Sequence, residues 1–135
     1  MSDKVTVRGY LLDTHAAIFS MGQSKSLSAL ARAAIAAGPN YLSLISYWEV
    51  VLKSMKGTLD VGDPRTWWSE ALEQLAATPL PLRPQHIAGV CALPAIHKDP
   101  FDRMLIAQAT AEKLTLVSMD GKVARYASKT LRVVG

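Results

Sequence analysis

The sequence predicts a single α/β domain built on a short, mostly parallel sheet of four to five strands. Short apolar runs of strand length alternate along the chain with segments of helical periodicity. The runs are apolar throughout, without regular alternation with polar residues, which is typical of strands covered by helices on both faces. Because 135 residues is an ordinary length for one domain, we expect residues 1–135 to share one hydrophobic core.

Five segments are expected to form the strands. The first begins near Val5 and closes at Leu12, and the second follows the breaker Gly38-Pro39-Asn40. The expected ranges are 5–12, 41–45 and 114–117, with weaker segments at 80–82 and 131–134. Prolines bracket the segment 80–82, which indicates an edge strand or a loop there.

Segments with apolar residues at helical spacing fill the intervals between these strands. Ser28 and Gly38 are the expected cap and stop of the first of them. Asp63-Pro64 and Asp99-Pro100 each place a capping acid before a proline, which is a common start of a helix. The expected helical ranges are 29–37, 48–55, 67–75, 87–93 and 104–113.

The composition is that of a folded protein, with 50% hydrophobic and 19% charged residues. No segment is apolar enough to span a membrane and no N-terminal signal sequence is visible, so we expect a cytoplasmic protein. The formal net charge of +4 is compatible with a polyanionic substrate or an acidic partner and establishes neither. Cys91 is the one cysteine; it lies in an apolar stretch and is expected to be a small core residue.

Acidic residues stand where the strand segments end. Asp13, Glu49 and Asp120 follow the first, second and third strong segments, and Asp102 opens the helix that precedes the third. Functional groups of open parallel sheets collect beyond the carboxyl ends of the strands, so we expect these four of the 11 acids to line one cleft.

Carboxylates brought this close would repel one another, and a cation is the usual remedy. Oxygen ligands of high charge suit Mg²⁺ or Mn²⁺, whereas zinc prefers His or Cys, and the three histidines are not spaced as ligands. Such ions bind phosphate oxygens and lower the pKa of water for an in-line displacement. The predicted reaction is therefore phosphodiester hydrolysis.

Structural roles for the same acids stay open at this point. Glu49 closes a capping box that begins at Ser46, and Asp102 is an acid in the first turn of a helix. Asp99 is interpreted as the cap of that helix and not as a metal ligand. Asp13 has no evident capping role unless it caps a helix that follows it.

Four segments of the chain resemble the PIN-domain family, and within it the VapC-like toxins of type II toxin–antitoxin systems. They occur in the family's order and span most of the chain, and Asp-Pro-Phe-Asp-Arg at 99–103 is the most distinctive. The segments are Leu11–His15, Ser43–Val50 with Lys53, His97–Ala109 and Leu116–Asp120. The departures are an N-terminal extension through Arg8 and a Phe19 where a Trp is common.

The resemblance implies a PIN-like α/β/α sandwich and a Mg²⁺- or Mn²⁺-dependent endoribonuclease. It implies an RNA substrate, a cognate antitoxin, a homodimer that assembles further with the antitoxin, and operator DNA bound only through the antitoxin. Carried over by position, Asp13, Glu49 and Asp102 match the family's three most constant acids, and Asp120 matches the more variable fourth. Ser118 stands where the family has Thr or Ser.

Other residues near these segments have weaker assignments. Thr14 and Ser46 are expected to fix ligand geometry through hydrogen bonds. Arg103 is predicted to contact substrate or antitoxin, while Lys53 is more often paired with a neighbouring acid. His15 and His97 could act as proton shuttles. Of the tryptophans, Trp48 lies at core spacing, and Trp67 and Trp68, adjacent on one helix, cannot both face inward.

Two hypotheses from other classes compete with the nuclease. A signalling receiver domain also carries acids at strand ends, but it needs paired early acids and a late-strand lysine, and this chain has only Asp13 early and no such lysine. A catalytically silent module that binds antitoxin or RNA would keep the fold without the reaction. DNA cleavage is a subordinate alternative, since the acids alone do not distinguish RNA from DNA.

Overall fold

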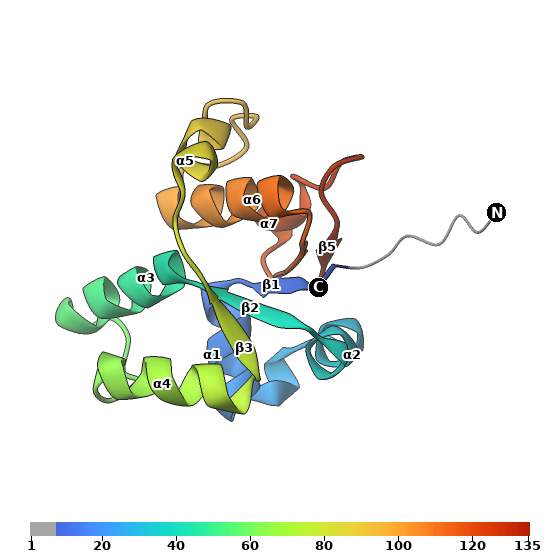
Figure 1. The fold of residues 1–135 in the computed structure, drawn as a ribbon. Coiled ribbons are helices and arrows are strands. Elements are labelled where there is room, and N and C mark those ends of the chain that lie inside the picture. Colours follow the sequence, from blue (N-terminus) through green and yellow to red (C-terminus); the bar gives the residue numbers. More distant parts are fainter. Residues whose placement is uncertain (1–7) are drawn as a thin grey trace.

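The computed structural model describes residues 8–135 and shows an all-parallel sheet of five strands in the order β3-β2-β1-β4-β5 (Figure 1). The strands are β1 (Tyr10–Leu12), β2 (Asn40–Ser43), β3 (Ala77–Leu80), β4 (Thr115–Val117) and β5 (Val133–Val134). The helices are α1 (Thr14–Gly22), α2 (Ala29–Ala37), α3 (Leu44–Met55), α4 (Pro64–Gln74), α5 (Pro84–Val90), α6 (Pro100–Glu112) and α7 (Gly121–Ala124), with a 3-10 turn η1 (Ser24–Ser26). The predicted α/β class with a short parallel sheet is confirmed. The segment expected at 80–82 forms the edge strand β3, which lies earlier than predicted and shares only Leu80 with that range.

Helices cover both faces of the sheet, which is why apolar residues of the central strands are buried whichever face they point to. Successive residues of β1 point to opposite faces, so Leu12 packs among α1, α2 and α4 while Leu11 packs against α6 and α7. Val117 and Leu116 of β4 divide in the same way. Figure 1 shows these two helix layers above and below the sheet, with α3 at one end in contact with both α4 and α6.

The register of the three central strands places their carboxyl ends side by side. Leu12 of β1 pairs with Leu42 of β2 and with Val117 of β4. The backbone N–H of Asp13 also donates to the carbonyl of Val117, at 2.9 Å. Residues that directly follow these strands therefore meet at one edge of the sheet.

Local capping explains most helix starts. Ser28, Asp63 and Asp99 each accept a hydrogen bond from a backbone N–H in the first turn of α2, α4 and α6, as predicted. The predicted start at Ser46 is wrong. Ser43 caps α3 by accepting from the N–H of Ile45, so the helix begins directly after β2, within the range expected to be strand.

Three further expectations need correction or completion. Cys91 follows the last turn of α5 and is exposed, because the chain leaves the core there. Trp48, expected in the core, is 56% exposed, because the buried face of α3 is formed by Ile45, Ser46, Glu49 and Val50. Trp67 is buried and Trp68 is partly buried, stacked on Tyr47. Val5 lies outside the described residues.

A few polar side chains cross the interior and join elements that are distant in sequence. The hydroxyl of Ser43 donates to Oε1 of Gln108 at 2.5 Å, which connects the start of α3 to the middle of α6. Gln108 also donates to the carbonyl of Pro81 and lies 3.3 Å from Nδ1 of His86. All three side chains, Ser43, Gln108 and His86, are fully buried. They fix the position of α6 relative to α3 and α5.

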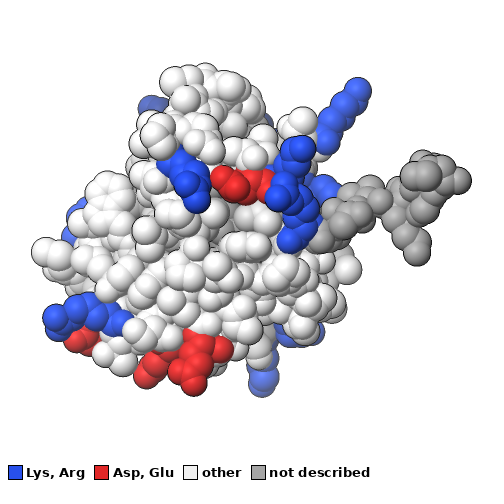
Figure 2. Space-filling model, viewed as in Figure 1, with Lys and Arg blue, Asp and Glu red and all other residues white. Residues whose placement is uncertain are grey.

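Charged side chains are dispersed over the surface. In the view of Figure 2, Lys and Arg form separate groups divided by acidic or uncharged surface, without a continuous basic face. Within residues 8–135, no helix has the length and apolar character needed to cross a membrane.

Candidate active site

A cleft of about 280 Å³ lies at the carboxyl edge of the sheet and contains all four acids predicted from the sequence. Its walls come from α1, α3, α6 and the segment that follows β4. The lining residues are Asp13, Thr14, His15, Phe19, Glu49, Lys53, Asp99, Asp102, Met119 and Asp120. The expectation that strand-end acids share one cleft agrees with this arrangement.

Asp13 lies at the end of the central strand and is 6% exposed. It caps α1, because Oδ1 accepts a hydrogen bond of 2.8 Å from the backbone N–H of Ala16. Burial raises the pKa of the Asp13 carboxyl, and the hydrogen bonds from Ser118 and Ala16 oppose this effect only in part. The capping role that the sequence left open is thus real, and it coexists with a place in the cleft.

Glu49 lies on α3 and is 3% exposed. Its Oε1 accepts a hydrogen bond of 2.5 Å from the hydroxyl of Thr14, which also lies 3.0 Å from the hydroxyl of Ser46. Its Oε2 forms an ion pair of 2.6 Å with Nζ of Lys53, one helical turn away. Both carboxylate oxygens of Glu49 are therefore engaged by protein groups.

Asp102 lies in the first turn of α6, with its side chain 20% exposed. Burial and the neighbouring charge of Asp99 raise the pKa of Asp102 to about 6, and Asp13 and Glu49 add to the rise. A hydrogen bond from His97, 3.2 Å from Oδ2, acts in the opposite direction. The acids thus act on one another electrostatically across the cleft.

Asp120 is placed differently from the other three acids. It is exposed at the cleft wall and caps the short helix α7 by accepting from the backbone N–H of Lys122 at 2.8 Å. Its own N–H donates to the hydroxyl of Ser118, which is 2% exposed. Ser118 also acts on Asp13, whose pKa it lowers.

No sequence pattern predicted the hydrogen-bond network behind Asp102. The buried hydroxyl of Tyr126 accepts from the backbone N–H of His97 at 3.2 Å and from Nη1 of Arg103 at 3.0 Å. Its own proton is then free for Nδ1 of His97, at 2.9 Å, which leaves Nε2–H to donate to Asp102. The same Arg103 nitrogen donates to the carbonyl of Pro94 at 2.8 Å. A substrate or antitoxin contact of Arg103 stays a prediction.

The donor set of the cleft suits a hard divalent cation. All the candidate ligands are carboxylate oxygens, and the raised pKa values of Asp13 and Asp102 show that the cleft disfavours their unpaired charge. As the side chains lie, no three or more His, Cys, Asp or Glu residues among 8–135 form a metal-holding group.

The PIN domain family matches residues 10–129. No curated protein is significantly similar to the chain in sequence. Similar solved structures include DNA-bound VapBC from Salmonella typhimurium, with 16% identity, a TM-score of 0.68 and coverage of 96% of this chain and 98% of that one. VapBC2 from Rickettsia felis bound to a DNA fragment from their promoter has 16% identity and a TM-score of 0.65, with coverage of 93% of this chain and 96% of that one. FitAcB from Neisseria gonorrhoeae has 22% identity and a TM-score of 0.63, with the same two coverages of 93% and 96%.

The solved structures agree with the fold over nearly the whole chain, and the family match covers every element from β1 to α7. Asp13, Glu49, Asp102 and Asp120 all fall inside the matched residues. The chain belongs to the PIN domain family.

Proposed function

We propose that the protein is a metal-dependent endoribonuclease and the VapC-like toxin of a toxin–antitoxin pair. The observation that carries the proposal is the cleft itself, where Asp13, Glu49 and Asp102 converge from three separate elements. A fold needs no such convergence of buried acids for its stability, since each unpaired buried charge destabilises it. The family match and the toxin–antitoxin complexes among the similar structures support the same function.

In this proposal Asp13, Glu49 and Asp102 hold Mg²⁺ or Mn²⁺, and Asp120 contributes from the cleft wall. The bound ion would supply charge at the phosphate and lower the pKa of the attacking water. Water adds to phosphorus, the phosphodiester bond to one ribose oxygen breaks, and that oxygen takes up a proton.

The neighbouring residues then serve to orient the acids. Thr14 donates to Glu49, and the N–H of Ala16 together with Ser118 holds Asp13. Ser46 supports Thr14 from inside α3. Ligands held in this way need little reordering when a cation binds, which favours both affinity and a defined geometry.

The similar toxin–antitoxin complexes support an antitoxin as partner, and the proposal extends to further partners. RNA is the substrate, and a cognate antitoxin binds the toxin, which forms a homodimer and a larger assembly with the antitoxin. In the proposal, operator DNA is bound through the antitoxin only; the complexes from Salmonella typhimurium and Rickettsia felis are DNA-bound, the latter with a promoter fragment. The cytoplasm, where RNA and operator are both present, is the proposed location.

The test is incubation of the purified protein, free of antitoxin, with a mixed RNA pool in Mg²⁺, in Mn²⁺ and in EDTA. Asp13→Asn is the matched variant, because Asn caps a helix as well as Asp does and keeps the shape of the side chain. Cleavage that needs the ion and disappears in Asp13→Asn supports the proposal. Metal-independent cleavage by folded Asp13→Asn protein contradicts it.

The same assay separates the alternatives. A folded protein that binds antitoxin but cleaves no RNA under any condition favours the silent binding module. A parallel incubation with single-stranded DNA distinguishes the two nucleic acids, and preferential DNA cleavage would replace the proposed substrate.

A further inference from the structure

Lys53 projects a positive charge into the acidic cleft. Among residues 8–135 it is the one lysine or arginine that lines the cleft. Its side chain is 35% exposed, whereas that of its partner Glu49 is 4% exposed. The ammonium thus reaches inward from the cleft mouth to a carboxylate that solvent hardly touches.

The contact with Glu49 is close, and each oxygen of that carboxylate has a protein partner. Nζ of Lys53 lies 2.6 Å from Oε2, and the hydroxyl of Thr14 occupies Oε1. The position of Glu49 four residues before Lys53 is a common helix pairing, which on an open surface contributes little. Here the carboxylate is buried, and removal of the partner of a buried charge is strongly destabilising.

Other acids share the cleft with this ammonium. Asp99 and Asp102 line it together with Lys53, opposite in charge to its side chain. The positive charge of Lys53 therefore lies among the acids proposed as metal ligands and beside the capping residue Asp99. A lysine in this position does what a bound cation would do, because it offsets the repulsion among the carboxylates.

We propose that Lys53 is a built-in counter-cation of the cleft, which pairs with Glu49 in the metal-free protein and is displaced from it when a divalent cation binds. This inference rests on the proposed function, since it takes Glu49 as a metal ligand. Its structural basis is that both oxygens of Glu49 already have protein partners, Thr14 and Lys53. Lys53 then competes with the metal instead of assisting it.

The test is the affinity of the full chain for Mn²⁺, measured by calorimetry, for wild type and Lys53→Met. Because no ammonium has to be displaced, we expect Lys53→Met to bind Mn²⁺ about tenfold more tightly. Lys53→Arg keeps the cation and should bind no more tightly than wild type. Lys53→Gln is the second neutral variant, with the same expected gain, in case Lys53→Met does not fold.

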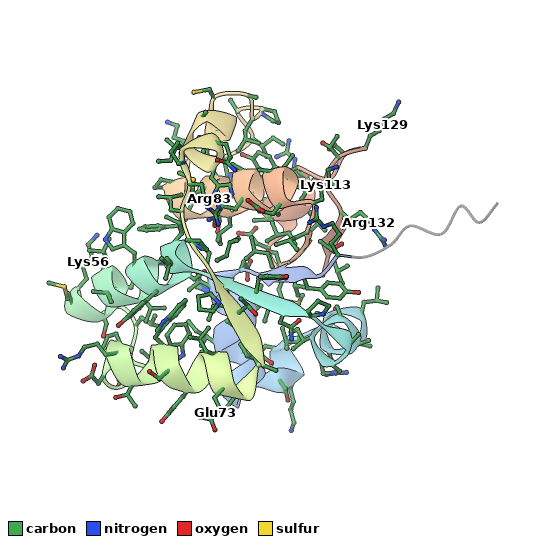
Figure 3. All side chains as sticks on the ribbon, in the orientation of Figure 1. Lys56, Glu73, Arg83, Lys113, Lys129 and Arg132 are labelled. Carbon is green, nitrogen blue, oxygen red and sulfur yellow. The ribbon has the colours of Figure 1, made fainter. Side chains whose placement is uncertain are left out.

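Lys56→Met is the matched control for the loss of one positive charge. Lys56 is exposed at the end of α3, directed away from the other helices in Figure 3, and does not line the cleft. The Lys56→Met substitution should leave Mn²⁺ affinity within about twofold of wild type, since solvent and salt screen the effect of an exposed charge outside the cleft. An equal gain in Lys53→Met and Lys56→Met would overturn the proposal, because the effect would then be one of net charge.

The second readout is the unfolding temperature, measured without metal and with it. In EDTA, Lys53→Met should unfold at a lower temperature than wild type, and saturating Mn²⁺ should remove the difference. Unchanged or weaker Mn²⁺ binding by folded Lys53→Met or Lys53→Gln would refute the competition and leave the metal site standing. If no form of the protein binds Mn²⁺, the proposed function fails, and this inference fails with it.

Discussion

Asp102→Asn should stabilise the metal-free protein while it abolishes the proposed reaction. Folding raises the pKa of Asp102 from 3.8 to about 6, so the ionised carboxyl destabilises the folded state at neutral pH. A shift of about two pKa units corresponds to about 3 kcal/mol, which solvent screening at the open cleft reduces to about 1–2 kcal/mol. Loss of the acid from the first turn of α6 costs about 0.5 kcal/mol. The net gain is about 1 kcal/mol.

Because folding raises the pKa of Asp102, the stability difference between Asp102→Asn and wild type depends on pH in a defined direction. Between about pH 4 and pH 6 the folded protein binds more protons at Asp102 than the unfolded chain does, so wild-type stability falls as pH rises through this window. Below pH 4 the carboxyl is protonated in both states, and the advantage of the amide disappears. The stability difference between Asp102→Asn and wild type should therefore appear between pH 4 and pH 6 and remain constant above.

Thermal unfolding in EDTA at pH 4 and pH 8 measures the difference. For 135 residues the unfolding entropy is about 0.28 kcal/mol/K, so about 1 kcal/mol raises Tm by about 3–4 °C at pH 8. Mn²⁺ should reverse the order, because a cation at one hundred times its Kd stabilises wild type by about 2.7 kcal/mol and the variant by less. An equal Tm at pH 8 in EDTA, or the same gain at pH 4, would refute the electrostatic reasoning.

Three other substitutions test the surroundings of the acids and the core. Thr14→Val removes the hydrogen bond to Glu49 and should cost about 1–2 kcal/mol in denaturant unfolding and weaken Mn²⁺ binding, while Thr14→Ser retains both. Tyr126→Phe frees Nδ1 of His97 and should lower Mn²⁺ affinity by about tenfold with the fold intact by circular dichroism; unchanged affinity would show that the network does not orient Asp102. Leu11→Ala, at a fully buried position, should cost about 2–5 kcal/mol, and a loss below 1 kcal/mol would contradict the tight packing of this core.

The place of the acids in one cleft was predictable because a parallel sheet brings the ends of its strands to one edge. To place Asp13 and Asp120 in the cleft, only the positions of the strands had to be predicted. To place Asp102 there, only the direction of the connection into β4 was needed. Glu49 was assigned to the cleft correctly, although its helix was expected to start at Ser46. Trp48 was expected in the core from its helical spacing, but the buried face of α3 runs through Ile45, Glu49 and Val50.

Contacts between distant segments could not be predicted from the sequence. Tyr126 reaches His97 across 29 residues, and neither residue has a local pattern that indicates the other. The pairing of Lys53 with Glu49 was one of several roles that its helical spacing allowed. Only the burial of Glu49, which depends on the whole fold, makes that pairing consequential.

The buried link between Ser43 and Gln108 has a mechanical consequence for the cleft. Ser43 caps the helix that carries Glu49, and Gln108 lies on the helix that carries Asp102. A buried hydrogen bond therefore joins the two helices beneath the acids. This interior hydrogen bond helps to set the separation of Glu49 and Asp102 without any contact between the two carboxylates. Groups that repel one another can in this way be kept at a defined distance by the packing beneath them.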